Sequence, residues 1–279
     1  MTEKQFKTTS VDIHYWTNDL LPGRPTLIML PGLTADHHLF DKQVDAFESE
    51  YNLFVWDAAG HAASRPFDLT FSLMDKAEWL HSILEAEGIK RPILVGQSMG
   101  GYVSQAFIQR YPGEASGFIS IDSAPLKRKY YPNWELRLLH HMEPLYRMYP
   151  WKTLVRQGSR GTAESAYGRQ LMAQMMHEYD AEPKYYSRLV GHGYAMLAEA
   201  IEANLSYDID CPCILICGEK DKAGDTKSFN RRWAAGENLP IHWIAGAGHN
   251  SNTDKPEEIN SIITQFLEDG QEQHTMRKL

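Results

Sequence analysis

The stretch Ile93-Leu94-Val95-Gly96-Gln97-Ser98-Met99-Gly100-Gly101 decides the fold. Its first three residues predict a short buried strand, and a helix is expected to follow Ser98. Gly96 and Gly100 flank Ser98 in the pattern G-x-S-x-G, which is typical of a serine on a sharp turn between strand and helix. Bulky residues at these two positions would collide with neighbouring backbone, and the strained turn would hold the hydroxyl out of the helix. The segment predicts that Ser98 is a nucleophile rather than a helix N-cap.

Five further apolar runs resemble the one before Ser98, and most lead into a polar turn and a stretch with helical periodicity. Near-continuous apolar strands are buried on both faces, as in a parallel sheet covered by helices. The chain therefore predicts an α/β fold with a mostly parallel, doubly wound sheet. The alternation of Val11, Ile13 and Tyr15 predicts an antiparallel edge strand or hairpin before it. The six runs are 26–30, 53–56, 93–95, 118–121, 213–216 and 241–244.

One long interval breaks this rhythm. About ninety residues separate the strand that ends near Asp122 from the one that begins near Pro212, which is too long for a bare loop. Helical stretches are predicted at 135–148 and 164–179. We therefore expect a helical cap insertion at 124–193, folded over one end of the sheet.

The cap would divide one core domain into two stretches of sequence, 1–123 and 194–279. Pro256 can occupy the first position of a last helix, where the acidic residues after it favour the positive end of the helix dipole. Residues 270–279 lack a packing pattern and are expected to form a frayed tail.

Composition and charge restrict the class of protein. The chain has 279 residues, 43% hydrophobic and 23% charged, as in ordinary globular enzymes. No apolar run approaches the roughly 18 residues of a membrane span, and residues 1–7 lack the apolar stretch of a secretory signal. We expect a cytoplasmic monomer or homodimer without membrane insertion. The net charge of −8 argues against nucleic acid as a partner, because displacing counterions needs a basic surface.

The three cysteines do not suggest a metal site. Cys211, Cys213 and Cys217 lie at positions of equal parity in one apolar run, so on a strand they would share one face. A metal site would want more ligands at finger-like spacing, and none of the twelve histidines lies close enough in sequence to suggest one. We predict that the cysteines pack in the core, and expect neither a metal ion nor a cofactor.

A nucleophilic serine needs a base, and the base needs an acid that holds it. In an open α/β sheet the residues just beyond the carboxyl ends of the strands form the site. His249 follows a predicted strand through the glycine-rich turn 245–248, and Asp221 follows the strand that ends at Cys217. Ser98, Asp221 and His249 therefore run in the order nucleophile, acid, base, which is one of the known orders of a catalytic triad.

Other residues of the same types are alternatives. Asp122 also stands at a strand end and could reach the imidazole of His249, whereas Asp225 lies a few residues beyond the favoured position. Four other histidines are more typical of surface or structural positions: His37, His38, His61 and His192.

Acyl transfer also needs two backbone donors aimed at the developing oxyanion. The amide of Met99, directly after the predicted nucleophile, would supply one. The turn Pro31-Gly32-Leu33-Thr34 follows the first parallel strand, and its Leu33 amide would supply the other.

Together these motifs resemble the α/β-hydrolase fold superfamily, in its serine-nucleophile branch, over essentially the full chain. The resemblance implies an elbow at Ser98, an oxyanion turn at 31–34 and an acid and a base at Asp221 and His249. It also implies that 57–64 is a structural turn. Two positions depart from the common pattern, since many relatives have histidine at Pro31 and glycine at Ala62, but neither change removes a catalytic atom.

The resemblance makes hydrolysis of a carboxylic ester, as in carboxylesterases, the first expectation. A serine at 98 argues against the dehalogenase and epoxide-hydrolase branches, which use an aspartate. Enzymes that cleave carbon-carbon bonds in ring-fission products share the triad and a similar Ser-Met-Gly-Gly elbow, so they stay open as an alternative. Two further alternatives fit the motifs less well. Cofactor-free dioxygenases of this fold have histidines where this chain has Gln97 and Met99, and a catalytically inactive binding protein of this fold usually lacks a triad member, whereas this chain has all three.

The predicted cap is rich in aromatic residues and methionine, which suit an adaptable apolar pocket. We therefore expect a small-molecule acyl substrate with apolar character, although any one of these side chains could simply pack the cap helices. The residues are Tyr130, Tyr131, Trp134, Met142, Tyr146, Met148, Tyr149, Trp151, Met172, Met175 and Met176.

Overall fold

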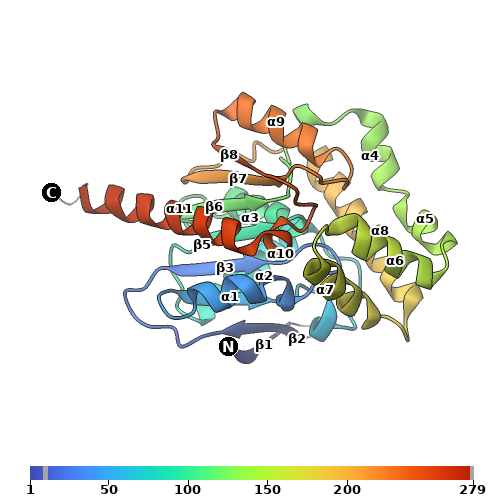
Figure 1. Cartoon of the computed structure of the whole chain (residues 1–279), viewed down its shortest axis with the longest axis horizontal. Helices are drawn as coiled ribbons and strands as arrows, with labels where there is room; N and C mark the ends of the chain where they lie inside the picture. Colours follow the sequence, from blue (N-terminus) through green and yellow to red (C-terminus); the bar gives the residue numbers. More distant parts are fainter. Residues whose placement is uncertain (9–11, 277–279) are drawn as a thin grey trace.

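A computed structural model describes residues 1–8 and 12–276, with side chains up to Gly270 (Figure 1). Within this range the chain forms an eight-stranded sheet in the order β1-β2-β4-β3-β5-β6-β7-β8. Strands β3 to β8 pair in parallel, and β2 is antiparallel to both β1 and β4. The predicted α/β class with a mostly parallel sheet is confirmed. The strands are β1 (Thr2–Lys7), β2 (Asp12–Thr17), β3 (Thr26–Leu30), β4 (Asn52–Trp56), β5 (Ile93–Gln97), β6 (Gly117–Ile121), β7 (Cys213–Gly218) and β8 (Ile241–Ile244).

The predicted opening hairpin is present as β1 and β2. Ile13 and Tyr15 lie on β2 and are buried, as the alternation of residue types indicates. Val11 lies outside the described residues.

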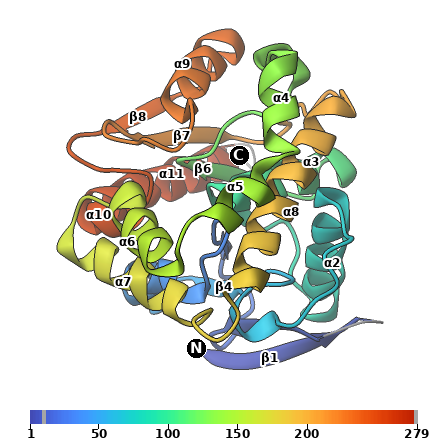
Figure 2. The same ribbon diagram turned by 90° about the vertical axis from the view of Figure 1, so that its right-hand side faces the viewer.

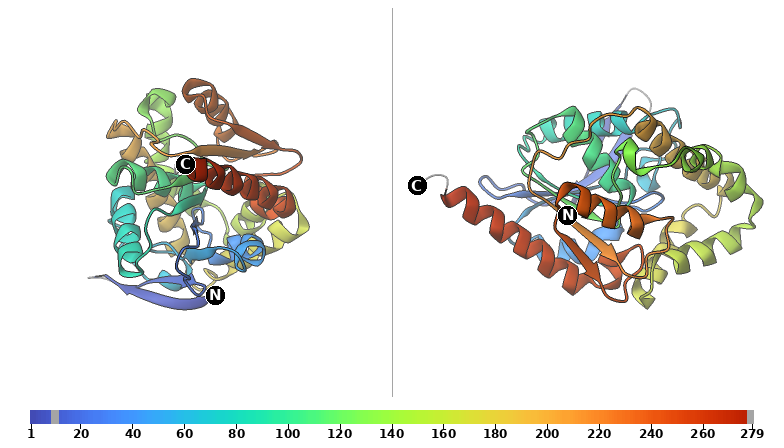
Figure 3. Two further views of the ribbon diagram at one scale, coloured as in Figure 1. Left: turned by 90° about the vertical axis from the view of Figure 1, so that its left-hand side faces the viewer. Right: turned by 90° about the horizontal axis from the view of Figure 1, so that it is seen from above.

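Helices cover both faces of the sheet, as Figure 3 shows. Successive residues of β3 enter different clusters: Ile28 packs with one set of helices, and Leu27 packs with the other. This explains the near-continuous apolar runs, because adjacent residues of a strand point to opposite faces. The first set is α2 (Leu73–Ala86), α3 (Met99–Arg110) and α9 (Thr226–Glu237), and the second is α1 (Asp41–Phe47) and α11 (Pro256–Met276).

Helices lie between β6 and β7 and cover one end of the sheet (Figure 2). The predicted helix at 135–148 is two helices, α4 and α5. Pro144 lies in the first turn of α5, where its missing N–H costs nothing, but it could not continue a helix from α4. The helix predicted at 164–179 is α7, and α6 was not expected from the sequence. The bounds are α4 (Asn133–Leu139), α5 (Met142–Met148), α6 (Trp151–Thr162), α7 (Ala166–His177) and α8 (Pro183–Glu202).

The predicted cap boundary at 193 falls inside α8. Tyr186 and Leu189, in its first half, pack with residues of α6 and α7. Leu197 and Ile201, in its second half, belong to the same cluster as α2 and α3. Helix α8 therefore packs with the helices over the end of the sheet and with the core domain, and the division at 124–193 stays a prediction. From here on, "cap" means α4 to α7 with the first half of α8.

The expected tail at 270–279 begins inside α11, which continues to Met276. Gly270 does not end the helix, because one glycine costs only about 1 kcal/mol and the residues after it, Gln271 and Glu272, are good helix formers. Residues 277–279 lie outside the described residues. None of the helices in the described chain combines the length and apolar character of a membrane span.

All three cysteines are free thiols. Cys213 and Cys217 are buried on β7, whereas Cys211 precedes that strand and is half-buried. The prediction of core packing therefore holds for the two cysteines that lie on the strand.

Candidate active site

Ser98 occupies the sharp turn between β5 and α3. Its backbone has φ 49° and ψ −115°, a region that side chains rarely adopt. A Cβ on Gly96 would lie 2.5 Å from the backbone of Gly100, and a Cβ on Gly100 would lie 1.8 Å from the Leu30 carbonyl oxygen. Only glycine fits at these two positions, for the steric reason that the motif predicts.

The fold brings together the three residues predicted to form a triad. Ser98 Oγ lies 2.8 Å from His249 Nε2, and His249 Nδ1 lies 2.9 Å from Asp221 Oδ2. Asp221 is 2% exposed and His249 is 8% exposed, so both lie beneath the surface. A carboxylate only accepts, so His249 donates from Nδ1 and can accept the serine hydroxyl at Nε2.

Charge and burial act in opposite directions on His249. Burial alone would lower the pKa of the imidazole, but the charge of Asp221 and its hydrogen bond outweigh burial. The charge of Asp122 adds to this effect. The pKa of His249 is therefore raised above its ordinary value, as befits an imidazole that becomes positively charged when it takes a proton.

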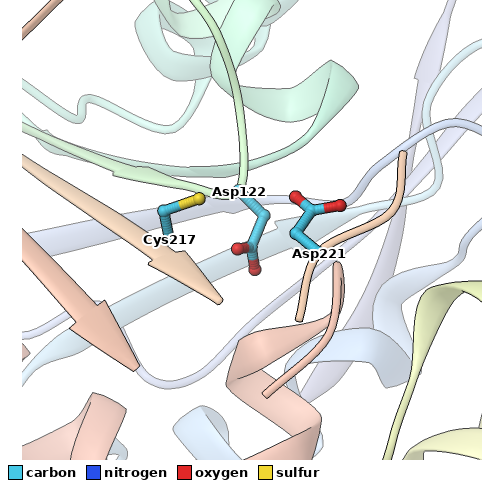
Figure 4. Close-up of side chains that lie close together, drawn as sticks. All are labelled: Asp122, Cys217 and Asp221. Atoms are coloured by element: carbon cyan, nitrogen blue, oxygen red, sulfur yellow. The ribbon is translucent and has the colours of Figure 1, made fainter. Parts of the chain in front are cut away.

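Asp122, the alternative acid, makes other contacts. Its Oδ1 accepts from the Gly218 amide at 2.7 Å, and its Oδ2 accepts from the Ser251 amide at 2.9 Å. Figure 4 shows Asp122 beside Asp221, near the end of β7. Burial, and then the charge of Asp221, raise the pKa of Asp122 to about 7. Asp221 contacts the imidazole, and Asp122 supports the backbone around it.

Cys217 completes this cluster, in which one ligand atom from each side chain lies within 4.8 Å of the others (Figure 4). Burial raises the pKa of the Cys217 thiol, whereas metals bind the thiolate. The carboxylates are occupied too, since Asp122 accepts from two backbone amides and Asp221 accepts from the Ala223 amide at 2.7 Å. We interpret the cluster as support for His249 rather than as a metal centre.

The turn at 31–34 lies against the elbow. A Cβ on Gly32 would approach Gln97 Oε1 to 2.4 Å and Ser98 Cβ to 3.1 Å. Leu33, the next residue, lines the same cavity as Ser98. The turn therefore lies beside the elbow and the start of α3, where Met99 is the first residue, and the oxyanion role of the Leu33 and Met99 amides stays a prediction.

Sequence reasoning missed Gln97, which links the elbow to the loop of His249. Its side-chain nitrogen donates to the His249 carbonyl at 2.8 Å and to Asn250 Oδ1 at 3.3 Å. Gln97 is 1% exposed, so these bonds are made away from bulk water. The motif G-x-S-x-G does not indicate this link, because it allows any residue at the position of Gln97 and the partners of Gln97 lie about 150 residues later.

A cavity of about 570 Å³ opens onto Ser98 and His249 between sheet and cap. Of the aromatic residues and methionines predicted for the pocket, four line it: Met142, Tyr146, Tyr149 and Met172. The others do not belong to its lining; Tyr130 and Tyr131 are buried with the core, and Trp134 is 64% exposed. The wall is mostly apolar or aromatic, and Lys222 is the one charged residue among the described residues that line it.

The alternative histidines lie elsewhere. His37 contacts Asp57 Oδ1 at 2.9 Å, and burial lowers the pKa of His61, which is enclosed near Ala59. Asp57 also accepts from the Ala63 amide, and Ser64 donates to the Asp57 carbonyl. The turn at 57–64 therefore has the structural hydrogen bonds that the resemblance implies.

The chain belongs to the alpha/beta hydrolase family, whose model matches residues 27–262. It is 23% identical over 95% of its length to the uncharacterized hydrolase YugF of Bacillus subtilis, covering 97% of that protein. It is 26% identical to a 2-hydroxy-6-oxononadienedioate/2-hydroxy-6-oxononatrienedioate hydrolase of Burkholderia vietnamiensis, over 93% of this chain and 92% of that protein.

Solved structures agree on the fold. A thermophilic esterase from Thermogutta terrifontis matches with a TM-score of 0.74 at 19% identity, over 97% of this chain and 99% of that one. The enol-lactonase from Burkholderia xenovorans matches with a TM-score of 0.73 at 18% identity, over 95% and 99% of the two chains. At these identities the likeness concerns the fold and leaves the substrate open.

Proposed function

We propose that the protein is a serine esterase that hydrolyses small carboxylic esters with an apolar acyl part. The observation that carries the proposal is the continuous hydrogen-bond chain from Ser98 Oγ through His249 to Asp221, at 2.8 Å and 2.9 Å, beside a largely apolar cavity.

In the proposed reaction Ser98 Oγ attacks the ester carbonyl carbon as His249 Nε2 takes the hydroxyl proton. Asp221 keeps the Nδ1 proton of His249 directed away from the serine and stabilises the imidazolium that forms. His249 then gives its proton to the leaving alcohol, and an acyl group remains on Ser98. Water, activated by His249, releases the acid and restores the serine.

The tetrahedral intermediate carries a negative oxygen that needs donors. We assign this role to the amides of Met99 and Leu33. The N-terminus of α3 adds a favourable dipole, since Met99 is its first residue. Loss of one such donor typically costs about 100- to 1000-fold in rate.

The cavity favours an uncharged substrate. Lys222, the one charged residue of the described lining, is paired with Glu164 at 3.1 Å. A carboxylate in the substrate would need a cation, and Lys222, the cation of the described lining, is already paired with Glu164. Tyr146, Tyr149 and Met172 instead offer apolar surface to an acyl chain.

A second candidate is hydrolysis of a carbon-carbon bond. It is favoured by the relative from Burkholderia vietnamiensis, whose name describes the hydrolysis of an oxo-dioate. The same serine, histidine and aspartate would serve. The pairing of Lys222 with Glu164 favours the ester, because the carboxylates of a dioate would find no unpaired lysine or arginine in the described lining.

The test compares wild-type protein and Ser98→Ala on p-nitrophenyl acetate, butyrate and octanoate, with a fluorophosphonate probe as an independent measure of the nucleophile. We expect hydrolysis and labelling by the wild type alone. Folded wild-type protein that stays unlabelled would contradict the serine-hydrolase proposal. Cleavage of a 2-hydroxy-6-oxo-dienoate faster than any ester would favour the second candidate.

A further inference from the structure

Asp254, the last residue of α10 (Ser251–Asp254), binds two separate parts of the chain. Its Oδ2 accepts from the Gly248 amide at 2.7 Å, directly before His249. Its Oδ1 accepts from the Ser165 amide at 2.7 Å, and both oxygens accept from the Glu164 amide, at 3.0 Å and 2.9 Å. Glu164 and Ser165 join α6 to α7 in the cap. One carboxylate thus holds the loop of the proposed base and a loop of the cap.

A second hydrogen bond joins the same two loops on the other side of His249. The Asn250 amide donates to the Thr162 carbonyl at 2.7 Å. Contact here is close, since a Cβ on Gly248 would lie 3.0 Å from that carbonyl oxygen and 3.3 Å from Asp254 Oδ2. We call these six residues the seam: Thr162, Glu164, Ser165, Gly248, Asn250 and Asp254.

The backbone of His249 is therefore fixed from both neighbours. Gly248 is held through Asp254, and Asn250 is held by Thr162 directly. A shift of the cap loop would move both residues and, with them, the imidazole. Helix α10 lies beside α7 in Figures 1 and 2, so the seam sits where the cap meets the core.

We propose that Asp254 is a positioning residue that couples the cap to His249, a role that rests on the proposed function. The Asp254 carboxylate accepts charge-assisted hydrogen bonds from three backbone amides, and these strong bonds hold the two loops together. No neutral side chain of this size accepts as many. The cap then does more than line the pocket, because the position of its loop and the alignment of His249 depend on each other.

The experiment compares wild-type protein with Asp254→Asn, which keeps the size and one acceptor oxygen, and with Glu257→Gln, a matched loss of an exposed charge on α11. We expect kcat of Asp254→Asn on p-nitrophenyl butyrate to fall by about 10- to 100-fold, because small misplacements of catalytic groups cost that much. The acid limb of kcat/KM should move to lower pH, since His249 loses alignment with Asp221. Hydrogen exchange at the amides of 164, 165 and 248 should become faster together. Glu257→Gln should change none of these.

Two results would overturn the coupling. One is a kcat within about twofold of wild type while the amides of 164 and 165 exchange faster. The other is a lower kcat with an unchanged acid limb and an unchanged amide of Gly248. If Asp254→Asn does not fold, Gly248→Ala tests the same contact by pushing against the Thr162 carbonyl, and the same shifts are expected. Fluorophosphonate labelling of Ser98 needs no ester substrate. If the wild type is labelled but cleaves no ester, the proposed substrate is refuted. The coupling is then tested by comparing the labelling rates of wild type and Asp254→Asn, and a slower rate is expected for the variant.

Discussion

Asp122 holds Ser251, two residues after His249, through both the amide and the hydroxyl of that serine. The same carboxylate reaches the Gly218 amide at the end of β7, where the chain turns toward Asp221. Two buried carboxylates therefore support one imidazole, Asp221 by contact and Asp122 through the backbone and its charge.

Asp122→Asn should move the acid limb of kcat/KM to lower pH. Protonated His249 cannot take the proton of Ser98, so activity falls as pH drops through the pKa of His249, which lies above 6.5 in the wild type. Removing a negative charge nearby lowers that pKa. The shift should be smaller than for Asp221→Asn, because Asp122, with a pKa of about 7, is partly protonated near neutral pH.

The measurement is a pH profile of p-nitrophenyl acetate hydrolysis. Asp225→Asn removes an exposed carboxylate at the start of α9 and should leave the acid limb in place. An unchanged limb in Asp122→Asn would leave Asp122 with a purely structural role.

Asp221→Asn should reduce kcat by about 10³- to 10⁴-fold, because an amide can donate to Nδ1 and favour the wrong tautomer of the imidazole. Steady-state kinetics with Ser98 labelling as a second readout would measure it. A loss below about tenfold would instead indicate that Asp122 takes over as the acid.

Gly100→Ala should prevent accumulation of folded protein, since the new Cβ would lie 1.8 Å from the Leu30 carbonyl oxygen in the sheet. Gly270→Ala is the matched control, because its Cβ meets no atom within 4 Å and helix α11 gains up to about 1 kcal/mol. Soluble yield and thermal melting would separate the two. A folded Gly100→Ala protein of wild-type stability would contradict the packing at the elbow.

Lys76→Met should stabilise the protein on the order of 2 kcal/mol at neutral pH, because a buried charge is replaced by an apolar side chain of similar length. Lys76 is 1% exposed on α2, and burial lowers its pKa to about 7. The unfolded chain binds the proton up to about pH 10.5, so the wild type should gain stability as pH rises from 7 to 10.5 and approach the variant.

Urea denaturation at pH 7 and pH 10 would measure both effects. A variant less stable than the wild type at pH 7 would show that the ammonium is stabilised by its surroundings, such as the ring of Phe71 at 5.4 Å.

The sequence by itself determined the strands, the elbow and the order of the three candidate residues. These features depend on local properties: apolar runs buried on both faces, and glycines where a side chain would meet backbone. The order of elements then requires Ser98, Asp221 and His249 to lie at one edge of a parallel sheet. The helical cap was also predictable from the length of the interval.

Only the tertiary structure decided which acid meets the imidazole. Asp122 and Asp221 both follow strands, but Asp221 contacts His249, whereas Asp122 contacts Ser251. Local sequence does not encode such a difference, because it depends on how two loops pack.

The seam and the burial of Lys76 are likewise decided by the tertiary structure and not by local sequence. Asp254 and Glu164 are 90 residues apart, and each alone is an ordinary acidic residue near a helix end. Lys76 lies on the apolar stripe of α2 with Leu73 and Leu80, but a lysine there could extend its ammonium to solvent, and only the packing shows that it is buried. Periodicity fixes which elements form, whereas the pairing of side chains across them follows from the close packing of the whole chain.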